Sequence, residues 1–290
     1  GTLTITGLGI AGGGTPQLNI VGNELFLNIT GGAPGVEWGS GDGTWADNVV
    51  GWNSGGTSVF TNGNVALLTD TFSTGNPTLT LNTTVLPQSV VVSSTNNYTV
   101  SGSGTIGGSA SITKLGSGSL TLDVANTHTG GVAHYAGALN IKNASALGDV
   151  TGTFTVRGGT IDNTSGGALT LPNHPQSWGS TLNFIGSSDL NLGAGAVTMT
   201  TGCSFTVGGA SKLTVGGDIA GAGFGFVKNG TGTLELNGNN TWTASSTLNL
   251  GEIVIGNDNA LNGALGLSLV FPTDANSKTL TLNGHSTTIR

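Results

Sequence analysis

The sequence predicts an all-β protein built as a parallel β-helix, a solenoid of stacked coils, and three observations support this fold class. Short runs that alternate apolar residues with Thr, Asn or Ser recur along the chain, as in SLTLDV at 119–124 and TLNFIG at 181–186. This period of two is typical of half-buried strands. Gly, Asn and Asp clusters separate the runs, as turns require. Helical periodicity of any length is missing.

The composition favours stacked coils over other all-β folds. Gly (53), Thr (44), Asn (28) and Ser (26) make up about half of the 290 residues, and only 7% are charged, against about 25% in an average soluble domain. Equivalent residues of stacked coils lie about 4.8 Å apart, so aligned like charges would repel while Asn and Thr ladders can hydrogen-bond. β-Sandwich repeats, the alternative fold, usually carry more charge on their solvent faces.

The charge balance excludes several classes of partner. The net charge of −7 argues against nucleic acid and against anionic membrane surfaces. No apolar run reaches 18 residues, so we expect no transmembrane helix. The single cysteine, Cys203, allows neither an intrachain disulfide nor a cysteine-based zinc site. Because the chain begins at Gly1, we expect it to be a piece of a longer protein.

Residues 1–75 differ from the rest and are predicted to form a loop-rich N-terminal β cap or a small separate β unit. Their alternation is less regular, their spacers are rich in Gly, and they hold three of the five tryptophans. Aromatic rings on loops can stack on sugars. Trp38, Trp45 and Trp52 are therefore candidates for glycan contact.

Residues 76–290 are predicted to form the repeat solenoid, with two repeat blocks at 114–148 and 228–262. The blocks align without a gap at an offset of 114 residues and share thirteen of 35 positions. With roughly 20–25 residues per coil, this offset corresponds to about five coils.

The shared positions divide into predicted structural roles. Alternating leucines are expected to face the interior, glycines to turn the corners, and the repeated Asn to complete the module. These residues are Gly116, Gly118, Leu120, Leu122, Asn126, Gly137 and Leu147, with Gly230, Gly232, Leu234, Leu236, Asn240, Gly251 and Leu261.

The two blocks also resemble a known repeat. The pattern K-x-G-[ST]-G-[ST]-L-x-L, followed by T-x-T, G-x-[LI]-x-[IV] and N-x-x-A-L, is similar to the autotransporter-associated β-strand repeat, or passenger-associated repeat, of bacterial surface and secreted proteins. His128 departs from the family's usual aromatic, which Trp242 keeps, and Ala244-Ser245 replaces a common Gly-Gly. The resemblance implies a right-handed parallel β-helix on the bacterial cell surface or beyond it. It does not imply an enzyme.

Residues that could carry chemistry are sparse. The fourteen acids form no D-D or D-x-D pair, two arginines cannot build a basic groove, and no G-x-S-x-G motif occurs. We therefore expect no catalytic residue and no cofactor. Asp42 and Asp47 in GDGTWAD, and Asp258 in GNDNALNG, are weak calcium candidates that turn chemistry also explains.

Three functions remain open at this point. The first is a structural extracellular repeat protein, a subunit or segment of a surface fibre, sheath or layer that self-associates through its solenoid ends. The second is an autotransporter-type adhesin passenger that binds glycans. The third and weakest is a β-helix enzyme that acts on polysaccharides.

Overall fold

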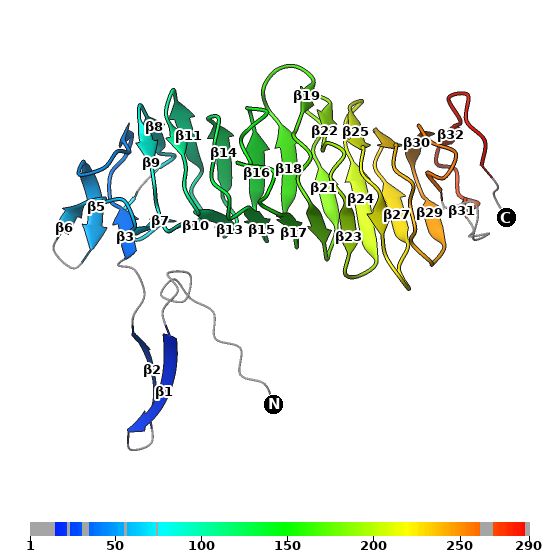
Figure 1. Ribbon diagram of the computed structural model, residues 1–290. Coiled ribbons are helices and arrows are strands. Elements are labelled where there is room, and N and C mark those ends of the chain that lie inside the picture. Colours follow the sequence, from blue (N-terminus) through cyan, green and yellow to red (C-terminus); the bar gives the residue numbers. More distant parts are fainter. Residues whose placement is uncertain are drawn as a thin grey trace.

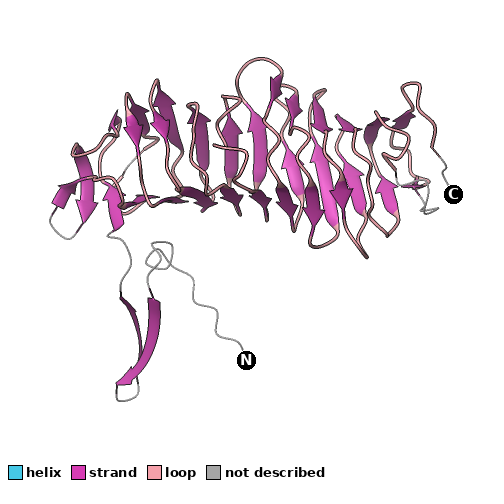
Figure 2. Ribbon diagram, viewed as in Figure 1, coloured by secondary structure: helices cyan, strands magenta, loops and turns pink. Residues whose placement is uncertain are grey.

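The computed structural model describes residues 15–21, 24–30, 35–54, 57–73, 75–261 and 269–287. Strands make up its regular structure, and no helix occurs among these residues (Figure 2). Strands of successive coils pair in parallel and stack along one axis into an elongated solenoid (Figure 1). This confirms the predicted all-β solenoid, and the long parallel ladders exclude the sandwich alternative. None of the described segments is a helix that could cross a membrane.

The coils present three faces, each of which is a sheet or a pair of sheets. The first face holds β3 (Gly35–Trp38), β5 (Val50–Ser54), β6 (Thr57–Val59), β7 (Val65–Thr69), β10 (Ser89–Ser93), β13 (Ser111–Leu115), β15 (Val132–His134), β17 (Phe154–Val156), β20 (Gln176–Trp178), β23 (Val197–Met199) and β26 (Ile219–Ala220). The second face holds β4 (Gly43–Thr44), β8 (Thr78–Leu81), β11 (Tyr98–Gly102), β14 (Ser119–Asp123), β16 (Ala138–Ile141), β18 (Thr160–Asn163), β21 (Leu182–Phe184), β24 (Cys203–Val207), β27 (Phe226–Asn229), β29 (Ser246–Leu248) and β31 (Leu269–Val270). The third face holds β9 (Thr84–Val85) with β12 (Thr105–Ile106), and then β19 (Leu169–Thr170), β22 (Leu190–Asn191), β25 (Lys212–Val215), β28 (Thr233–Leu236), β30 (Gly251–Ile255) and β32 (Lys278–Thr281).

The coil length is nearly constant. From β7 to β26, the strands of the first face begin at intervals of 21 to 24 residues. Within a strand, alternate side chains enter the interior, as in β14, where Leu120 and Leu122 are buried. Leu120 pairs with Leu139 of the next coil and Leu122 with Ile141. Apolar residues therefore form columns along the axis, and each buried leucine contributes about 2 kcal/mol to stability.

The sheets of the solenoid continue across the predicted boundary at residue 75. β3 pairs in parallel with β7, and β7 with β10, so the predicted unit 1–75 shares the solenoid's sheets from residue 35 onward. β5 then pairs antiparallel with β3 and ends the parallel stack of the first face. β1 (Thr15–Val21) and β2 (Glu24–Thr30) form a separate antiparallel hairpin. Residues 1–14 lie outside the described residues.

Aromatic side chains fill the interior at two places. Trp38, Trp45, Trp52 and Phe60 are fully buried beside the antiparallel end, with ring centroids 5.1 to 5.6 Å apart. A second column follows the axis farther along, where successive rings contact edge to face at 5.0 to 5.5 Å. Its members are Trp178, Phe205, Phe226 and Trp242.

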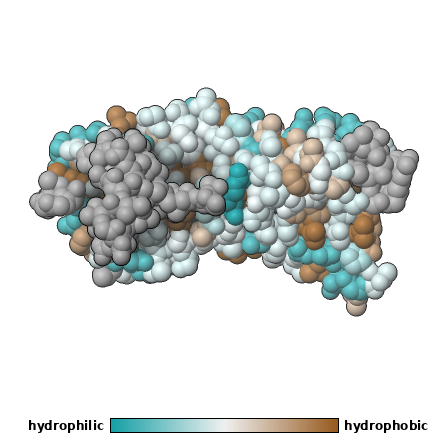
Figure 3. Space-filling view, turned by 90° about the horizontal axis from the view of Figure 1, so that it is seen from below, coloured by the Kyte–Doolittle hydropathy of each residue, from teal (hydrophilic) through white to brown (hydrophobic). Residues whose placement is uncertain are grey.

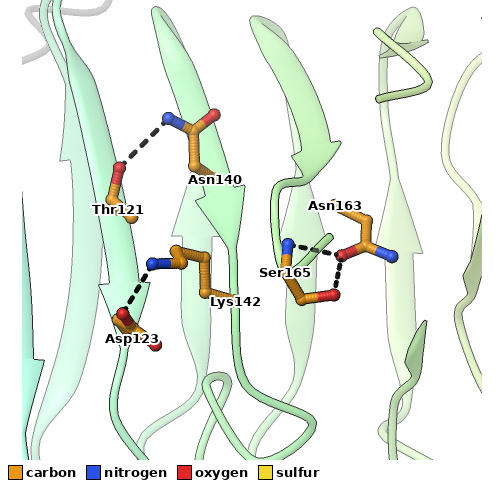
Figure 4. Close-up of polar contacts among 6 residues, drawn as sticks. All are labelled: Thr121, Asp123, Asn140, Lys142, Asn163 and Ser165. Atoms are coloured by element: carbon orange, nitrogen blue, oxygen red, sulfur yellow. Dashed lines mark hydrogen bonds and ion pairs between the residues drawn. The ribbon is translucent and has the colours of Figure 1, made fainter. Parts of the chain in front are cut away.

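One face of the solenoid carries few strongly polar and few strongly apolar residues. Seen from below, the side on which β10, β13 and β15 lie, most residues are pale, and the strongly polar and strongly apolar ones stand in small groups (Figure 3). Figure 4 shows how the second face uses its outward polar residues: Asn140 donates to Thr121 at 3.1 Å, and Lys142 pairs with Asp123 at 2.7 Å. Each contact joins two adjacent coils.

The close approach of stacked coils makes some glycines irreplaceable. A Cβ on Gly118 would lie 2.0 Å from the Asn96 carbonyl oxygen of the preceding coil, whereas a Cβ on Gly167 would meet nothing within 4 Å. We expect Gly118→Ala to lower the free energy of unfolding by about 2–4 kcal/mol, and Gly167→Ala to change it by less than about 1 kcal/mol. Urea unfolding at pH 7 measures both. Equal effects of the two variants would contradict the close stacking.

Candidate functional site

The two repeat blocks each bury one lysine in the solenoid interior. Lys114 lies on β13 with its side chain fully buried, and its Nζ donates to the carbonyls of Leu115, Gly116 and Ala136 at 2.5 to 3.1 Å. The first carbonyl belongs to the last residue of β13, the second to the corner that follows, and the third to the next coil. An ammonium group has three N–H donors, so these acceptors satisfy it completely.

Lys228 on β27 repeats this arrangement. It is also fully buried, and its Nζ donates to the carbonyls of Asn229, Gly230 and Leu250 at 2.8 to 3.1 Å. Burial lowers the pKa of each lysine to about 8. Both side chains therefore remain protonated at neutral pH, where they bind the carbonyls as cations. We call these two arrangements the lysine clamps.

A buried asparagine in each block joins three coils. The Oδ1 of Asn126 accepts the Ile106 amide of the preceding coil at 3.0 Å, and its Nδ2 donates to the Ala146 carbonyl of the following coil at 2.8 Å. Asn240 does the same with the Ile219 amide and the Ala260 carbonyl, both at 2.7 Å. These asparagine clamps replace backbone partners at positions where the strand ladder is interrupted.

The remaining motif positions support the clamps. Gly116 and Gly137, with Gly230 and Gly251, adopt φ values of 67° to 80°, which favour glycine. A Cβ on Gly137 would lie 2.6 Å from the Lys114 Nζ, so this glycine leaves room for the ammonium. Gly118 and Gly232 pass close to the backbone of the preceding coil. The motif leucines of both blocks are buried: Leu120, Leu122, Leu147, Leu234, Leu236 and Leu261.

The two blocks lie on different faces of the solenoid. Lys114 is on the first face, but Lys228 is on the second, and the L-x-L strand moves from the second face (β14) to the third (β28). The offset of 114 residues is thus five coils plus one face, rather than the five coils expected. The same motif therefore forms the same contacts whichever face it starts on.

Three histidines are buried in the solenoid interior, and one of them lies beside the first clamp. His134 pairs in register with Lys114 one coil farther on, and both His128 and His134 have no exposed surface. Burial lowers the pKa of His128 and of His134 to about 4, and the Lys114 ammonium adds to the effect on His134. His174 is buried beside the Gly152 carbonyl, and burial lowers its pKa as well. In the second block, Trp242 and Leu248 occupy the positions of His128 and His134.

Seven of the fourteen acids hold a backbone amide of the next coil. In each case the aspartate carboxylate accepts a hydrogen bond from an amide 15 to 36 residues later, at 2.7 to 2.9 Å. Asp162 lies within β18, and the other six aspartates lie in turns between strands. The pairs are Asp42 with Thr78, Asp47 with Asn62, Asp70 with Thr95, Asp162 with Ser187, Asp189 with Lys212, Asp218 with Asn239 and Asp258 with Ser286.

These contacts bear on the calcium candidates. Asp42 and Asp47 bind separate amides, and Asp258 also pairs with His285 at 3.2 Å. No group of three or more His, Cys, Asp or Glu that could hold a metal ion occurs in the described part of the chain. The aspartates thus act as corner acceptors in this structure.

The three N-terminal tryptophans do not form a sugar platform. Trp38, Trp45 and Trp52 each have no exposed surface, because their rings pack together at the end of the solenoid interior. Their position in a Gly-rich, irregular segment suggested exposed loops, whereas the segment folds around them. Outward polar grooves instead lie on the third face. One of about 190 Å³ is lined by Asp189, Asn191 and Lys212, and one of about 200 Å³ by Thr233, Glu252 and Thr279.

The lysine clamps could not be assigned from the alternation pattern alone, which treats lysine as an outward residue. A signal was nevertheless present. The chain has five lysines, two of which recur at the same repeat position, two residues after an apolar residue, Ile112 or Phe226. Residues two apart on a strand share a face, so this spacing places both lysines inside.

Removal of a clamp should destabilise the fold. Lys114→Met keeps the volume but leaves three buried carbonyls without their donor, and we expect a loss of about 2–4 kcal/mol in the free energy of unfolding. Lys142→Met removes the half-exposed pair with Asp123 and should cost less than about 1 kcal/mol. Urea midpoints at pH 7 measure both variants. A Lys114→Met protein as stable as the wild type would contradict the clamp.

Acid should weaken the solenoid between pH 6.5 and 4. In this window the unfolded chain protonates histidines that the folded state keeps neutral, so stability falls as the pH falls, by about 2–3 kcal/mol for each of His128 and His134. His134→Leu, which copies Leu248, should reduce this pH dependence and keep the stability at pH 7. An acid profile of His134→Leu that matches the wild type would contradict the assignment.

Comparison with known proteins identifies a repeat family and two relatives. Residues 112–143 and 226–255 match the passenger-associated transport repeat family. The chain is 30% identical over 162 residues to the adhesin BmaC autotransporter of Brucella suis biovar 1 (strain 1330), and 28% identical over 167 residues to outer membrane protein B of Rickettsia rickettsii. These alignments cover 56% and 55% of this chain.

The chain spans a small part of these relatives, because the same alignments cover 4% of the adhesin and 10% of the outer membrane protein. No solved structure matches the chain. Each matched segment contains one lysine clamp with its glycine corners and L-x-L strand. The chain therefore carries two passenger-associated transport repeats, in residues 112–143 and 226–255.

Proposed function

We propose that this chain is a rigid structural segment of a bacterial surface fibre, and that it associates with further segments or copies through the ends of its solenoid. The observation that carries this proposal is the duplication of the clamps. In both repeats, shared residues form hydrogen bonds between adjacent coils. These residues are Lys114 and Asn126 in one block and Lys228 and Asn240 in the other. What the repeats have in common is thus a way of holding a long stack together.

The repeats and the relatives indicate a location at the bacterial cell surface. A stack of this kind suits that location. Each coil contacts its two neighbours, so stability grows with the number of coils and the rod can lengthen without a larger core. The engagement of seven aspartates by backbone amides argues against a cluster of free carboxylates for catalysis.

The C-terminal end of the described stack offers a surface for association. β31 and β32 are the last strands of the second and third faces, and each pairs with one neighbour in its sheet. Val270, Phe271 and Leu282 near this end are 45%, 39% and 42% exposed. An exposed strand edge with apolar residues beside it is a template for adding another strand.

Adhesion to glycans is the second candidate function. The name of the Brucella relative describes an adhesin, and the two polar grooves of the third face are the places where a sugar chain could lie along the rod. Such binding would depend on Lys212 and Glu252 rather than on the buried tryptophans.

Sedimentation and electron microscopy of the purified chain test end-to-end association. We expect linear assemblies that lengthen with protein concentration. Val270→Lys places a charge at the terminal edge and should weaken association at least tenfold, whereas Thr206→Lys, on the side of the second face, should not. Isolated short rods at every concentration would contradict self-association and favour the adhesin function.

A further inference from the structure

An apolar patch lies on the outside of the first face, over its first coils. We define this outer patch as Val65, Leu67, Val91 and Leu115. Val91 pairs with Leu67, and farther along the same outward row the positions are occupied by small or polar residues. These are Thr113, Ala133, Thr155, Ser177 and Thr198. The apolar part of the row is thus confined to β7 and β10, with Leu115 beside it.

Two residues of the outer patch, Val91 and Val65, are more deeply buried than the outward residues farther along the first face. Val90 and Val92 face the interior, so Val91 between them faces outward, and yet Val91 is only 2% exposed. Val65 on β7 is 1% exposed. Thr113 and Thr155 are half-buried and Thr198 is exposed, as outward residues of a single-layer sheet should be. A second layer over β7 and β10 would account for the difference.

The N-terminal hairpin has a face that such a layer requires. In its register Leu18 pairs with Leu27, Ile20 with Leu25 and Pro16 with Ile29, so these six residues fall on one face of the ribbon. The opposite face is mixed: it includes Gln17, Asn19 and Asn28 together with Phe26 and Val21. A two-stranded hairpin is marginally stable on its own in water and gains stability by covering its apolar face.

The connection to the solenoid keeps the hairpin close to the outer patch. Four residues, 31–34, separate the end of β2 from the start of β3. They span about 17 Å at most. β3 is the neighbour of β7 in the first face, and β7 is the neighbour of β10. So short a tether gives the hairpin a high effective concentration at these coils.

We propose that the apolar face of the β1–β2 hairpin packs on the outer patch and forms a second layer over β7 and β10. The occupant is this chain's own hairpin, because the two apolar faces are joined by four residues and the row turns polar beyond their reach. The hairpin thereby covers the outer surface of the first coils, while the buried tryptophans fill their interior.

Hydrogen–deuterium exchange of the full chain tests this docking. In the wild type, we expect the amides of 15–30 to exchange at least tenfold more slowly than in an unstructured peptide, independently of protein concentration. Val91→Asp in the outer patch and Leu27→Asp in the hairpin should each abolish this protection. Thr155→Asp, in the polar part of the same row, and Asn28→Asp, on the other face of the hairpin, should preserve it.

Protection of residues 98–123 serves as the internal reference, because it shows that the solenoid remains folded in each variant. Free-peptide exchange of the hairpin in the wild type would overturn the proposal, as would unchanged protection in Val91→Asp. Protection that appears only at high protein concentration would also overturn it, because the occupant would then be the hairpin of a second copy.

Discussion

The structure depends on one constraint: each coil must satisfy its backbone polar groups with the coils on either side. Parallel ladders do this along the faces, but at the corners the chain turns and its carbonyls and amides leave the ladder. Each lysine clamp supplies three N–H donors that bind carbonyls facing the interior. Each asparagine clamp supplies one donor, which binds a carbonyl, and one acceptor, which binds an amide. On the outside, corner aspartates accept the remaining amides. Nine of the chain's 21 charged residues, two lysines and seven aspartates, are thereby assigned to stacking.

The offset between the repeats follows from the same constraint. A clamp needs a strand, a glycine corner and the coil that follows, and these parts exist wherever one face meets the next. The motif can therefore move from the first face to the second, as Lys114 and Lys228 do, without loss of its contacts. The period of the sequence repeat is consequently not a whole number of coils. Trp242 occupies the repeat position of His128, and both are buried. The interior therefore accommodates side chains of different size and polarity beside the same lysine and asparagine clamps.

Much of the fold could be predicted from the sequence, because strand alternation and turn residues are local signals. The all-β class and the inward leucines follow from a period of two. Two features could not be predicted in this way, and a third was indicated only by the spacing between Lys114 and Ile112. The burial of Trp38 and its neighbours depends on the antiparallel strand β5 folding back over the first coil. The continuity of the sheets through residue 75 depends on long-range pairing. The interior position of Lys114 opposes its usual preference and is stabilised by carbonyls of two coils.

The most direct test of this account is the exchange rate of two backbone amides, those of Ile106 and Ile219, measured residue by residue by NMR at neutral pH. Each donates to the side chain of a clamp asparagine rather than to a backbone carbonyl. If the asparagine clamps join the coils, both amides should exchange as slowly as the ladder amides of β13. Exchange of both at rates typical of exposed loop amides would contradict the claim that the repeats hold the stack together through their side chains.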